Sequence, residues 1–282
     1  MSKIATMPNP DHLVRVETQF DRFSKLWRDL YSEPQQMNDI VLHNRKDYCL
    51  DFLYRHVRPG SKVLDVGCGA GVVALEAVQK GYVIHGVDVA HKMIKLCNRL
   101  FFGNNIDPAK YSFSAGAITD LALPENSFDG ILALGFLEYQ TDEHKVLNCL
   151  NKLLRPGGTM VITGPIDIKI TGLFGLAKVY GVLKNRIKNW QYGSEAWKHP
   201  AAGISINRYS TAAFKNILQR AGFSVVDYKR HGYASFWPLQ SIERSKQFKI
   251  EFFLHNNLTR LSKIVPIDRY ANEIIAVAKK VR

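Results

Sequence analysis

Residues 63–71 read V-L-D-V-G-C-G-A-G, and the fold can be worked out from this stretch. Its first four residues are apolar apart from one aspartate, a pattern typical of a strand buried on both faces. Glycines then alternate at Gly67, Gly69 and Gly71, and an apolar stretch of helical length follows. A strand that turns through glycines into a helix exposes bare backbone to a ligand, because a Cβ would block the turn and the close approach.

The spacing of these glycines and two aspartates narrow the class of ligand. A dinucleotide-binding loop, G-x-G-x-x-G, would have its third glycine at position 72, where this chain has Val72. Asp65 lies before the first glycine, and Asp88 ends the next apolar run, where a carboxylate suits two ribose hydroxyls. The alternative is that both aspartates only cap loops. We favour a nucleoside ligand without a pyrophosphate.

Strands and helices alternate from residue 61 to residue 165. We expect strands at 61–66, 82–88, 111–115, 128–134 and 159–163, and helices at 71–80, 91–102 and 141–154, the last capped by Thr141. Two more strands are expected at 223–229 and 274–278. Strands separated by single helices predict a parallel sheet with helices on both faces.

The pattern D-x-G-x-G-x-G at 65–71 resembles motif I of the class I S-adenosylmethionine-dependent methyltransferases, and residues 121–139 and 153–163 resemble the later motifs of that family. F-D-R-F-S-K-L-W-R-D-L-Y at 20–31, followed by M-N-D-I and R-K-D-Y, resembles the N-terminal part of the ubiquinone-biosynthesis O-methyltransferases. The resemblance implies an α/β fold: a doubly wound, seven-stranded, mostly parallel sheet of order 3-2-1-4-5-7-6, with N-terminal helices and a helical insert after strand 5.

The resemblance also implies S-adenosyl-L-methionine as the cofactor, lying over the carboxyl ends of strands 1 and 4. The residues that it assigns to the cofactor are Arg45, Asp65, Gly67, Cys68, Gly69, Gly71, Asp88, Val89, Met93, Ala117, Ile118 and Leu134. In the family, the arginine that matches Arg45 meets the cofactor carboxylate, which a guanidinium can hold with two parallel bonds. A solvated helix arginine is the alternative.

One position departs from the family pattern. The family usually has an aspartate, which accepts a hydrogen bond from the adenine amino group, where this chain has Ala117. Backbone groups and the apolar neighbours Ile118 and Met93 would then hold adenine. We expect binding to survive, weakened by about 1 kcal/mol, the net worth of a hydrogen bond.

We expect one domain over residues 1–282. It comprises an N-terminal helical cover (1–60), a cofactor-binding core (61–165), a substrate or lid insert (166–209), and C-terminal core strands with a basic cover (210–282). The insert mixes lysines with large apolar residues such as Leu173, Phe174 and Trp190, which suits a membrane interface. In the resembled family an insert here shapes a lipophilic substrate site. A lid helix packed on the core is the alternative.

The charge is concentrated in the C-terminal part. Residues 166–282 hold 20 basic and 7 acidic residues, which accounts for the whole formal net charge of +13. This asymmetry predicts an anionic partner: a membrane surface, an acidic carrier protein or an anionic substrate. A basic surface kept for solubility is the alternative. A nucleic-acid partner is disfavoured, because residues 134–137 read L-G-F-L where amine-modifying DNA methyltransferases have Asp/Asn-Pro-Pro-aromatic.

The rest of the composition predicts a cytoplasmic protein. No apolar run approaches the ~18 residues of a transmembrane helix, and the first residues lack the apolar core of a signal peptide. The four cysteines are scattered without metal-binding spacing, which is typical of thiols in a reducing compartment. Peripheral attachment to a membrane is compatible with these features.

The resulting functional prediction is methyl transfer from S-adenosylmethionine to a small lipophilic or anionic acceptor, at a hydroxyl oxygen. A hydroxyl acceptor needs a base near neutral pKa, and histidine is the natural choice. His199 lies in the insert, where the resembled family also has a histidine, and His231 follows the sixth strand. The alternatives are C- or N-methylation of a carrier-bound intermediate, a nucleic-acid methyltransferase, and a non-catalytic cofactor-binding protein.

Overall fold

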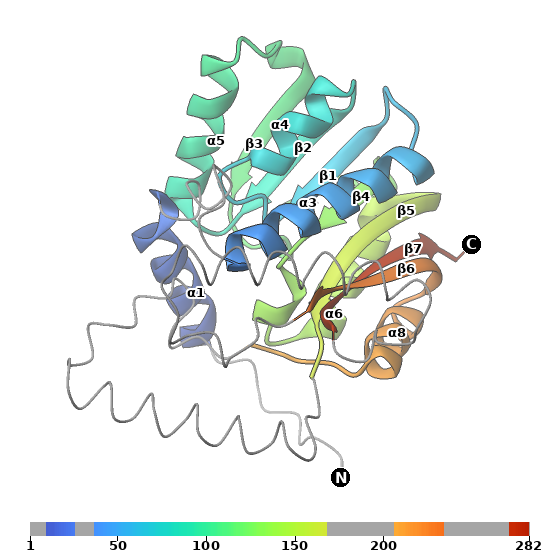
Figure 1. The fold of residues 1–282 in the computed structure, drawn as a ribbon. Helices are drawn as coiled ribbons and strands as arrows, with labels where there is room; N and C mark the ends of the chain where they lie inside the picture. Colours follow the sequence, from blue (N-terminus) through green and yellow to red (C-terminus); the bar gives the residue numbers. More distant parts are fainter. Residues whose placement is uncertain (1–9, 26–36, 168–205, 234–270, 282) are drawn as a thin grey trace, which may run out of the picture.

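A seven-stranded sheet forms the centre of the computed structural model, which describes residues 10–25, 37–167, 206–233 and 271–281 (Figure 1). The strand order is β3-β2-β1-β4-β5-β7-β6, which confirms the predicted order. The strands are β1 (Lys62–Val66), β2 (Val83–Asp88), β3 (Tyr111–Ala115), β4 (Phe128–Ala133), β5 (Leu154–Pro165), β6 (Phe223–Tyr233) and β7 (Ala271–Lys280). Neighbours are parallel, except that β7 runs antiparallel to both β5 and β6.

The central strand β1 pairs with β2 on one side and with β4 on the other. Val63, Leu64 and Val66 are fully buried, and Asp65 among them is 2% exposed. Because β1, β2 and β4 are parallel, the loops that follow them meet at one edge of the sheet, which we call the carboxyl edge. The antiparallel β7 begins at this same edge, since Glu273 pairs with Pro165 of β5 and with His231 of β6.

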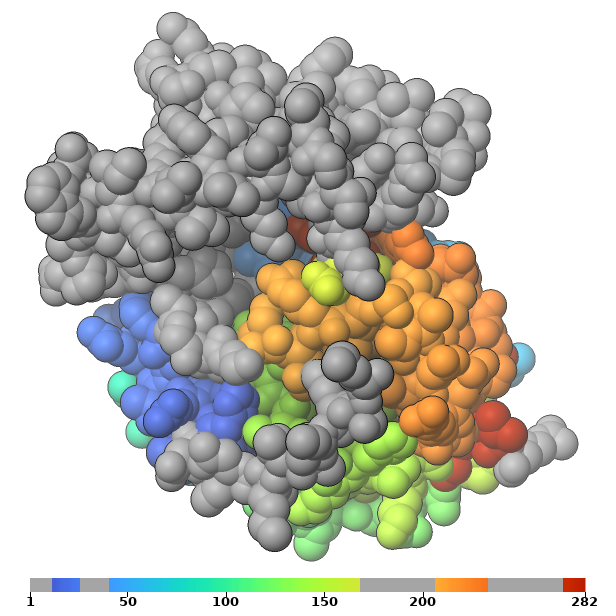
Figure 2. Space-filling view, turned by 90° about the horizontal axis from the view of Figure 1, so that it is seen from below, coloured from blue at the N-terminus to red at the C-terminus, as the bar shows by residue number. Residues whose placement is uncertain are grey.

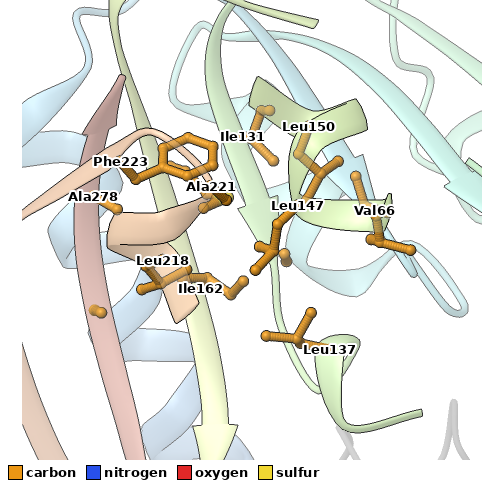
Figure 3. Close-up of a cluster of buried hydrophobic side chains, with 14 of the residues drawn as sticks. Val66, Ile131, Leu137, Leu147, Leu150, Ile162, Leu218, Ala221, Phe223 and Ala278 are labelled. Atoms are coloured by element: carbon orange, nitrogen blue, oxygen red, sulfur yellow. The ribbon is translucent and has the colours of Figure 1, made fainter. Parts of the chain in front are cut away.

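Helices cover both faces of the sheet, as the alternating pattern predicted. The helices are α1 (Pro10–Arg22), α3 (Met37–His56), α4 (Val72–Gln79), α5 (His91–Gly103), α6 (Glu143–Leu153) and α8 (Thr211–Arg220), with short 3-10 turns η1 (Pro108–Lys110) and η2 (Leu137–Tyr139). On one face, Leu147 and Leu150 of α6 and Leu218 of α8 pack on the sheet (Figure 3). On the other face, α3 and α4 bury Leu53 and Ala74.

Several boundaries differ from the prediction: β6 and β7 are longer than the expected 223–229 and 274–278, and the start of α6 and of β5 also differ. The cap of α6 is Asp142, whose side chain accepts a hydrogen bond from the Lys145 amide at 2.9 Å, and not Thr141. Strand β5 begins at Leu154, because that residue pairs with Phe128 across a bulge in the ladder. In contrast, Ser210 caps α8 as its sequence suggests.

The two ends of the predicted insert lie side by side at the carboxyl edge. Ile166 pairs with Tyr209, and the Asn207 amide donates to the Glu138 carbonyl oxygen at 2.8 Å. The insert therefore leaves and rejoins the core beside η2. Figure 2 shows one face of the molecule, on which the segment that holds α8 and β6 (orange) and α1 (blue) lie on either side of a green strip from the middle of the chain.

The body of the insert, with His199, Leu173, Phe174 and Trp190, lies outside the described residues, as does most of the predicted basic cover. The division into a single domain over residues 1–282 therefore stays a prediction. Among the described helices, none combines the length and the apolar character that crossing a bilayer requires.

Candidate functional site

The glycine loop between β1 and α4 has a space at its centre. Gly67, Gly69 and Gly71 all have positive φ, at 70°, 54° and 83°. A Cβ at Gly67 would lie 3.0 Å from the Phe136 ring, and one at Gly71 would lie 3.0 Å from the Cys97 sulfur. A Cβ at Gly69 would meet nothing within 4 Å among the residues that the structure describes. Two of the glycines are therefore required by packing, whereas the third faces open space.

Asp88, at the end of β2, braces this loop. One carboxylate oxygen accepts a hydrogen bond from the Gly69 amide and the other accepts from the Ala90 amide, both at 2.9 Å. Burial raises the pKa of Asp88 to about 6, although these two amide bonds oppose the shift. A carboxylate has about four lone-pair sites, so the loop contacts leave acceptor capacity for ribose hydroxyls. The loop-capping and ligand-binding interpretations are thus compatible.

Asp65, in β1 just before the loop, is a buried acid with an unsatisfied oxygen. It is 2% exposed, and its Oδ2 has no hydrogen-bond partner among the residues that the structure describes. Burial, with a contribution from the charge of Asp88, raises the pKa of Asp65 to about 7. A buried acceptor without a partner costs about 1–3 kcal/mol. A donor such as the amino group of a ligand would satisfy it.

The residues predicted to hold adenine are divided between two apolar clusters. Met93 is buried with Ala70 and Ala90, and Phe20 of α1 packs on this group. Ile118 is buried in the cluster beneath α6 and α8. Val89 and Ala117 are partly exposed. No carboxylate occupies position 117.

Cys68 supports the loop through a second thiol. Its sulfur lies 3.9 Å from that of Cys97, and the Cys97 thiol donates to the Gly69 carbonyl oxygen at 3.0 Å. Burial and the contact with Cys97 keep the pKa of Cys68 well above its usual value, so the thiol stays protonated. Within the described ranges, no group of three or more His, Cys, Asp or Glu side chains is arranged to hold a metal ion.

Arg45 reaches the loop that follows β4. It comes from α3, and its Nη1 would lie 3.0 Å from a Cβ at Gly135, which has a φ of +59°. The Gly135 amide donates to the Thr163 hydroxyl at 2.8 Å, and the preceding Leu134 packs toward α3 and α4. The prediction that Arg45 and Leu134 lie near the carboxyl end of β4 agrees with this arrangement; their contact with a cofactor stays a prediction.

Arg45 belongs to a group of ionisable side chains that we call the charge cluster. Its members are Arg45, Glu138, Glu273 and His231. Arg45 Nη1 lies 3.1 Å from Glu273 Oε1, and His231 Nε2 lies 2.7 Å from Glu273 Oε2. Burial alone would raise the pKa of Glu273, but Arg45 and His231 outweigh it and hold that pKa at about 2. Burial raises the pKa of Glu138 to about 7, despite the opposing charge of Arg45.

Sequence reasoning assigned roles to two members of this cluster and not to the other two. His231 and Arg45 were predicted as site residues. The sequence also places Glu138 after the fourth strand, near the expected methyl group, but without an assigned role, and Glu273 was missed. The sequence does contain a pattern that could have identified Glu273. Like Asp65 in β1, it is the single acid in a largely apolar strand, β7. His231 is 1% exposed and is brought to the carboxyl edge by β6.

The raised pKa of Glu138 predicts a pH-dependent stability. The ordinary pKa of a glutamate is 4.5 and that of Glu138 in the folded protein is about 7, so ionisation increasingly disfavours folding as the pH rises between these values. Glu138→Gln should therefore increase the free energy of unfolding by about 2–3 kcal/mol at about pH 8 and by little at about pH 5. Urea denaturation of both proteins at the two pH values measures this. Glu125→Gln, which alters an exposed glutamate, is the control, and a gain from Glu138→Gln that is equal at both pH values would contradict the assignment.

Comparisons with known proteins agree with this geometry. A family model described as a methyltransferase domain matches residues 41–228. A ubiquinone biosynthesis O-methyltransferase of Chromobacterium violaceum is 34% identical over 149 residues, which cover 50% of this chain and 60% of that protein. A ubiquinone biosynthesis O-methyltransferase of Xanthomonas campestris is 28% identical over 152 residues, which cover 52% of this chain and 60% of that protein. The chain thus spans about three fifths of these curated relatives.

Solved structures share the fold at low sequence identity. Magnesium protoporphyrin IX methyltransferase from Synechocystis, with bound S-adenosylhomocysteine, has a TM-score of 0.64 at 17% identity, covering 95% of this chain and 99% of that one. A chain described as the 4+2 cyclase SpnF has the same TM-score and identity, covering 100% and 99%. At this level of identity, the likeness concerns the fold alone.

Proposed function

This chain belongs to the methyltransferase-domain family, and from that premise we propose that it transfers a methyl group from S-adenosylmethionine to a hydroxyl oxygen of a small lipophilic or anionic acceptor. One observation carries the proposal: at the carboxyl edge, the Asp88 carboxylate accepts from the Gly69 amide, a Cβ at Gly69 would meet no described atom within 4 Å, and Asp65 has a buried oxygen without a partner among the described residues. A ligand with a ribose and an amino group matches these two acids. The hydroxyl acceptor is supported by the curated relatives, which are named O-methyltransferases.

Each part of the cofactor has a counterpart among the described residues. Asp88 would accept from the ribose hydroxyls, and the backbone of the Gly67–Gly71 loop allows close approach. Asp65 would face the amino group and Arg45 the carboxylate. Adenine would lie against the Val89, Met93 and Ile118 segments, without a carboxylate at Ala117. When bound, the cofactor supplies a methyl group that its sulfonium makes electrophilic, so that the protein mainly has to align the acceptor.

Binding and transfer can be tested in that order. Calorimetry should show S-adenosylhomocysteine binding to the purified protein. Labelled S-adenosylmethionine should then methylate a pool of catechols and quinols in preference to acyl-carrier-bound compounds or RNA. Binding without transfer to any pool would favour a non-catalytic cofactor-binding protein, and transfer to RNA would favour the nucleic-acid alternative.

We assign the base to His199 first and to His231 second. His199→Ala should lower turnover about 100-fold, the lower range of a general base's contribution, while leaving the affinity for S-adenosylhomocysteine intact. Steady-state kinetics and calorimetry measure the two effects. His144→Ala on α6, an exposed histidine, is the control. Unchanged turnover in His199→Ala would move the assignment to His231.

A second part of the proposal is that residues 166–282 dock on an anionic membrane surface to reach a lipophilic acceptor. These residues carry the whole net charge of +13, and the insert joins the core beside η2 at the carboxyl edge. Each basic residue near an anionic surface contributes about 1 kcal/mol, and salt screens this attraction. The protein should sediment with anionic liposomes at low salt, bind neutral ones less, and dissociate at high salt.

Charge-removal variants make the docking test specific. Replacing Lys178, Lys184 and Lys188 of the insert with glutamine should weaken liposome binding. The matched change at Lys80, Lys92 and Lys95, which are exposed on the core, removes the same charge and should have little effect. If anionic liposomes at low salt do not retain the unaltered protein, its basic half faces a substrate or a carrier protein.

A further inference from the structure

Glu273 joins two basic side chains that come from distant parts of the chain. Its Oε1 contacts Arg45 of α3 at 3.1 Å, and its Oε2 contacts His231 of β6 at 2.7 Å. The Glu273 side chain is 9% exposed, and its pKa of about 2 keeps it ionised at neutral pH. A single buried carboxylate thus fixes both groups at the carboxyl edge.

The contact with Glu273 holds the guanidinium of Arg45 at the carboxyl edge. The same Nη1 that bonds to Glu273 would be 3.0 Å from a Cβ at Gly135, so the guanidinium lies directly over the loop after β4. An arginine side chain has many rotamers, and holding one of them costs conformational entropy. A fixed carboxylate partner pre-organises the planar guanidinium for a second, bidentate contact.

The ionisation of Glu138 sets the charge around the pair formed by Arg45 and Glu273. Arg45 is positive and Glu273 is negative, and the pKa of about 7 at Glu138 leaves that carboxyl about half protonated at neutral pH and mostly protonated below it. A buried ion pair by itself is weak evidence for stability, because desolvation offsets the attraction between the charges. Its position beside the glycine-loop site favours a functional role.

We infer that Glu273 is a positioning residue, which holds Arg45 over the end of β4 so that the guanidinium meets the carboxylate of the cofactor's amino-acid part. This inference rests on the proposed cofactor. Glu273 does not touch the cofactor; it acts through Arg45. The same carboxylate also lies 2.7 Å from His231 Nε2.

Two ligands distinguish a positioning role of Glu273 from a general disruption of the binding site. S-adenosylhomocysteine carries the amino-acid part, whereas 5′-methylthioadenosine has the adenosine and the thioether without it. Glu273→Gln should lower the affinity for S-adenosylhomocysteine about tenfold or more and change that for 5′-methylthioadenosine less than about twofold, corresponding to 1.4 kcal/mol per tenfold. Calorimetry with both ligands measures the two affinities.

A second variant and a matched control complete the test. Arg45→Met should produce the same selective loss, and combining it with Glu273→Gln should add little, because both changes remove one interaction. Glu76→Gln on α4 breaks another glutamate contact with α3, that of Lys46, and should leave both affinities unchanged.

The outcomes distinguish the inference from the function on which it rests. Equal losses for both ligands in Glu273→Gln and Arg45→Met would overturn the positioning role while leaving the cofactor assignment in place. Circular dichroism identifies a variant that fails to fold. If Glu273→Gln does not fold, Glu273→Asp, which keeps the charge on a shorter side chain, replaces it in the comparison of the two ligands. An unaltered protein that binds neither ligand would overturn the proposed cofactor and the inference together.

Discussion

Replacing Gly69 with valine is expected to abolish the binding of S-adenosylhomocysteine. The residue has a φ of +54°, which costs a side-chain-bearing residue about 1–2 kcal/mol. The new side chain would also enter the open space that a Cβ at this position faces. Together these effects should lower the affinity more than about 100-fold, which is 2.7 kcal/mol or more. Titration calorimetry measures this directly.

Gly157→Val is the matched control for Gly69→Val. Gly157 also has a positive φ, at 75°, and a Cβ there would also meet no atom of the described residues within 4 Å. It lies at the start of β5, away from the carboxyl edge. The two variants therefore share the backbone strain and differ in position. If both bind S-adenosylhomocysteine as the unaltered protein does, the glycine loop is not the cofactor site.

Asp88→Ala should have the second-largest effect, a loss of roughly 100-fold in the affinity for S-adenosylhomocysteine. Hydrogen bonds to a charged group contribute about 1.5–3 kcal/mol each, and the variant removes those to the ribose hydroxyls. It also removes the bonds that the carboxylate accepts from the Gly69 and Ala90 amides. Calorimetry with adenosine as a second ligand should show a comparable loss, because adenosine keeps the ribose.

Asp107→Ala controls for the loss of an aspartate that caps a turn. The Asp107 side chain accepts a hydrogen bond from the Ala109 amide at 2.9 Å, in the exposed turn before β3. Its removal should leave ligand affinity unchanged. An Asp88→Ala protein that retains full affinity would show that Asp88 only braces the loop, which is the alternative that the sequence left open.

Local sequence patterns predicted most of the fold. The apolar run before Gly67 and the run that ends at Asp88 gave strands β1 and β2, because a strand buried on both faces needs continuous apolar residues. The boundaries of the helices and strands were predicted less accurately than their order. Thr141 and Asp142 are both good capping residues, and only the fold decides that Asp142 accepts the Lys145 amide.

The site was predictable where it is local in sequence. The glycine loop and Asp88 are close along the chain, and their spacing alone predicts a nucleoside-binding site. Arg45 and Glu273 are 228 positions apart, so only the antiparallel placement of β7 brings them together. Glu138 illustrates the same limit: its raised pKa follows from burial and from the charges around it, none of which a local pattern contains.

The position of β7 also determines the order in which the strands of the sheet can pair while the chain is being synthesised. β7 follows every other strand in the chain, yet it lies between β5 and β6. Until it leaves the ribosome, β5 is an open edge and β6 has no neighbour to pair with. Open strand edges favour aggregation, so the nascent chain is most vulnerable just before this strand emerges. The glycine loop is synthesised early, whereas the contact between Arg45 and Glu273 can form only after β7 has been made.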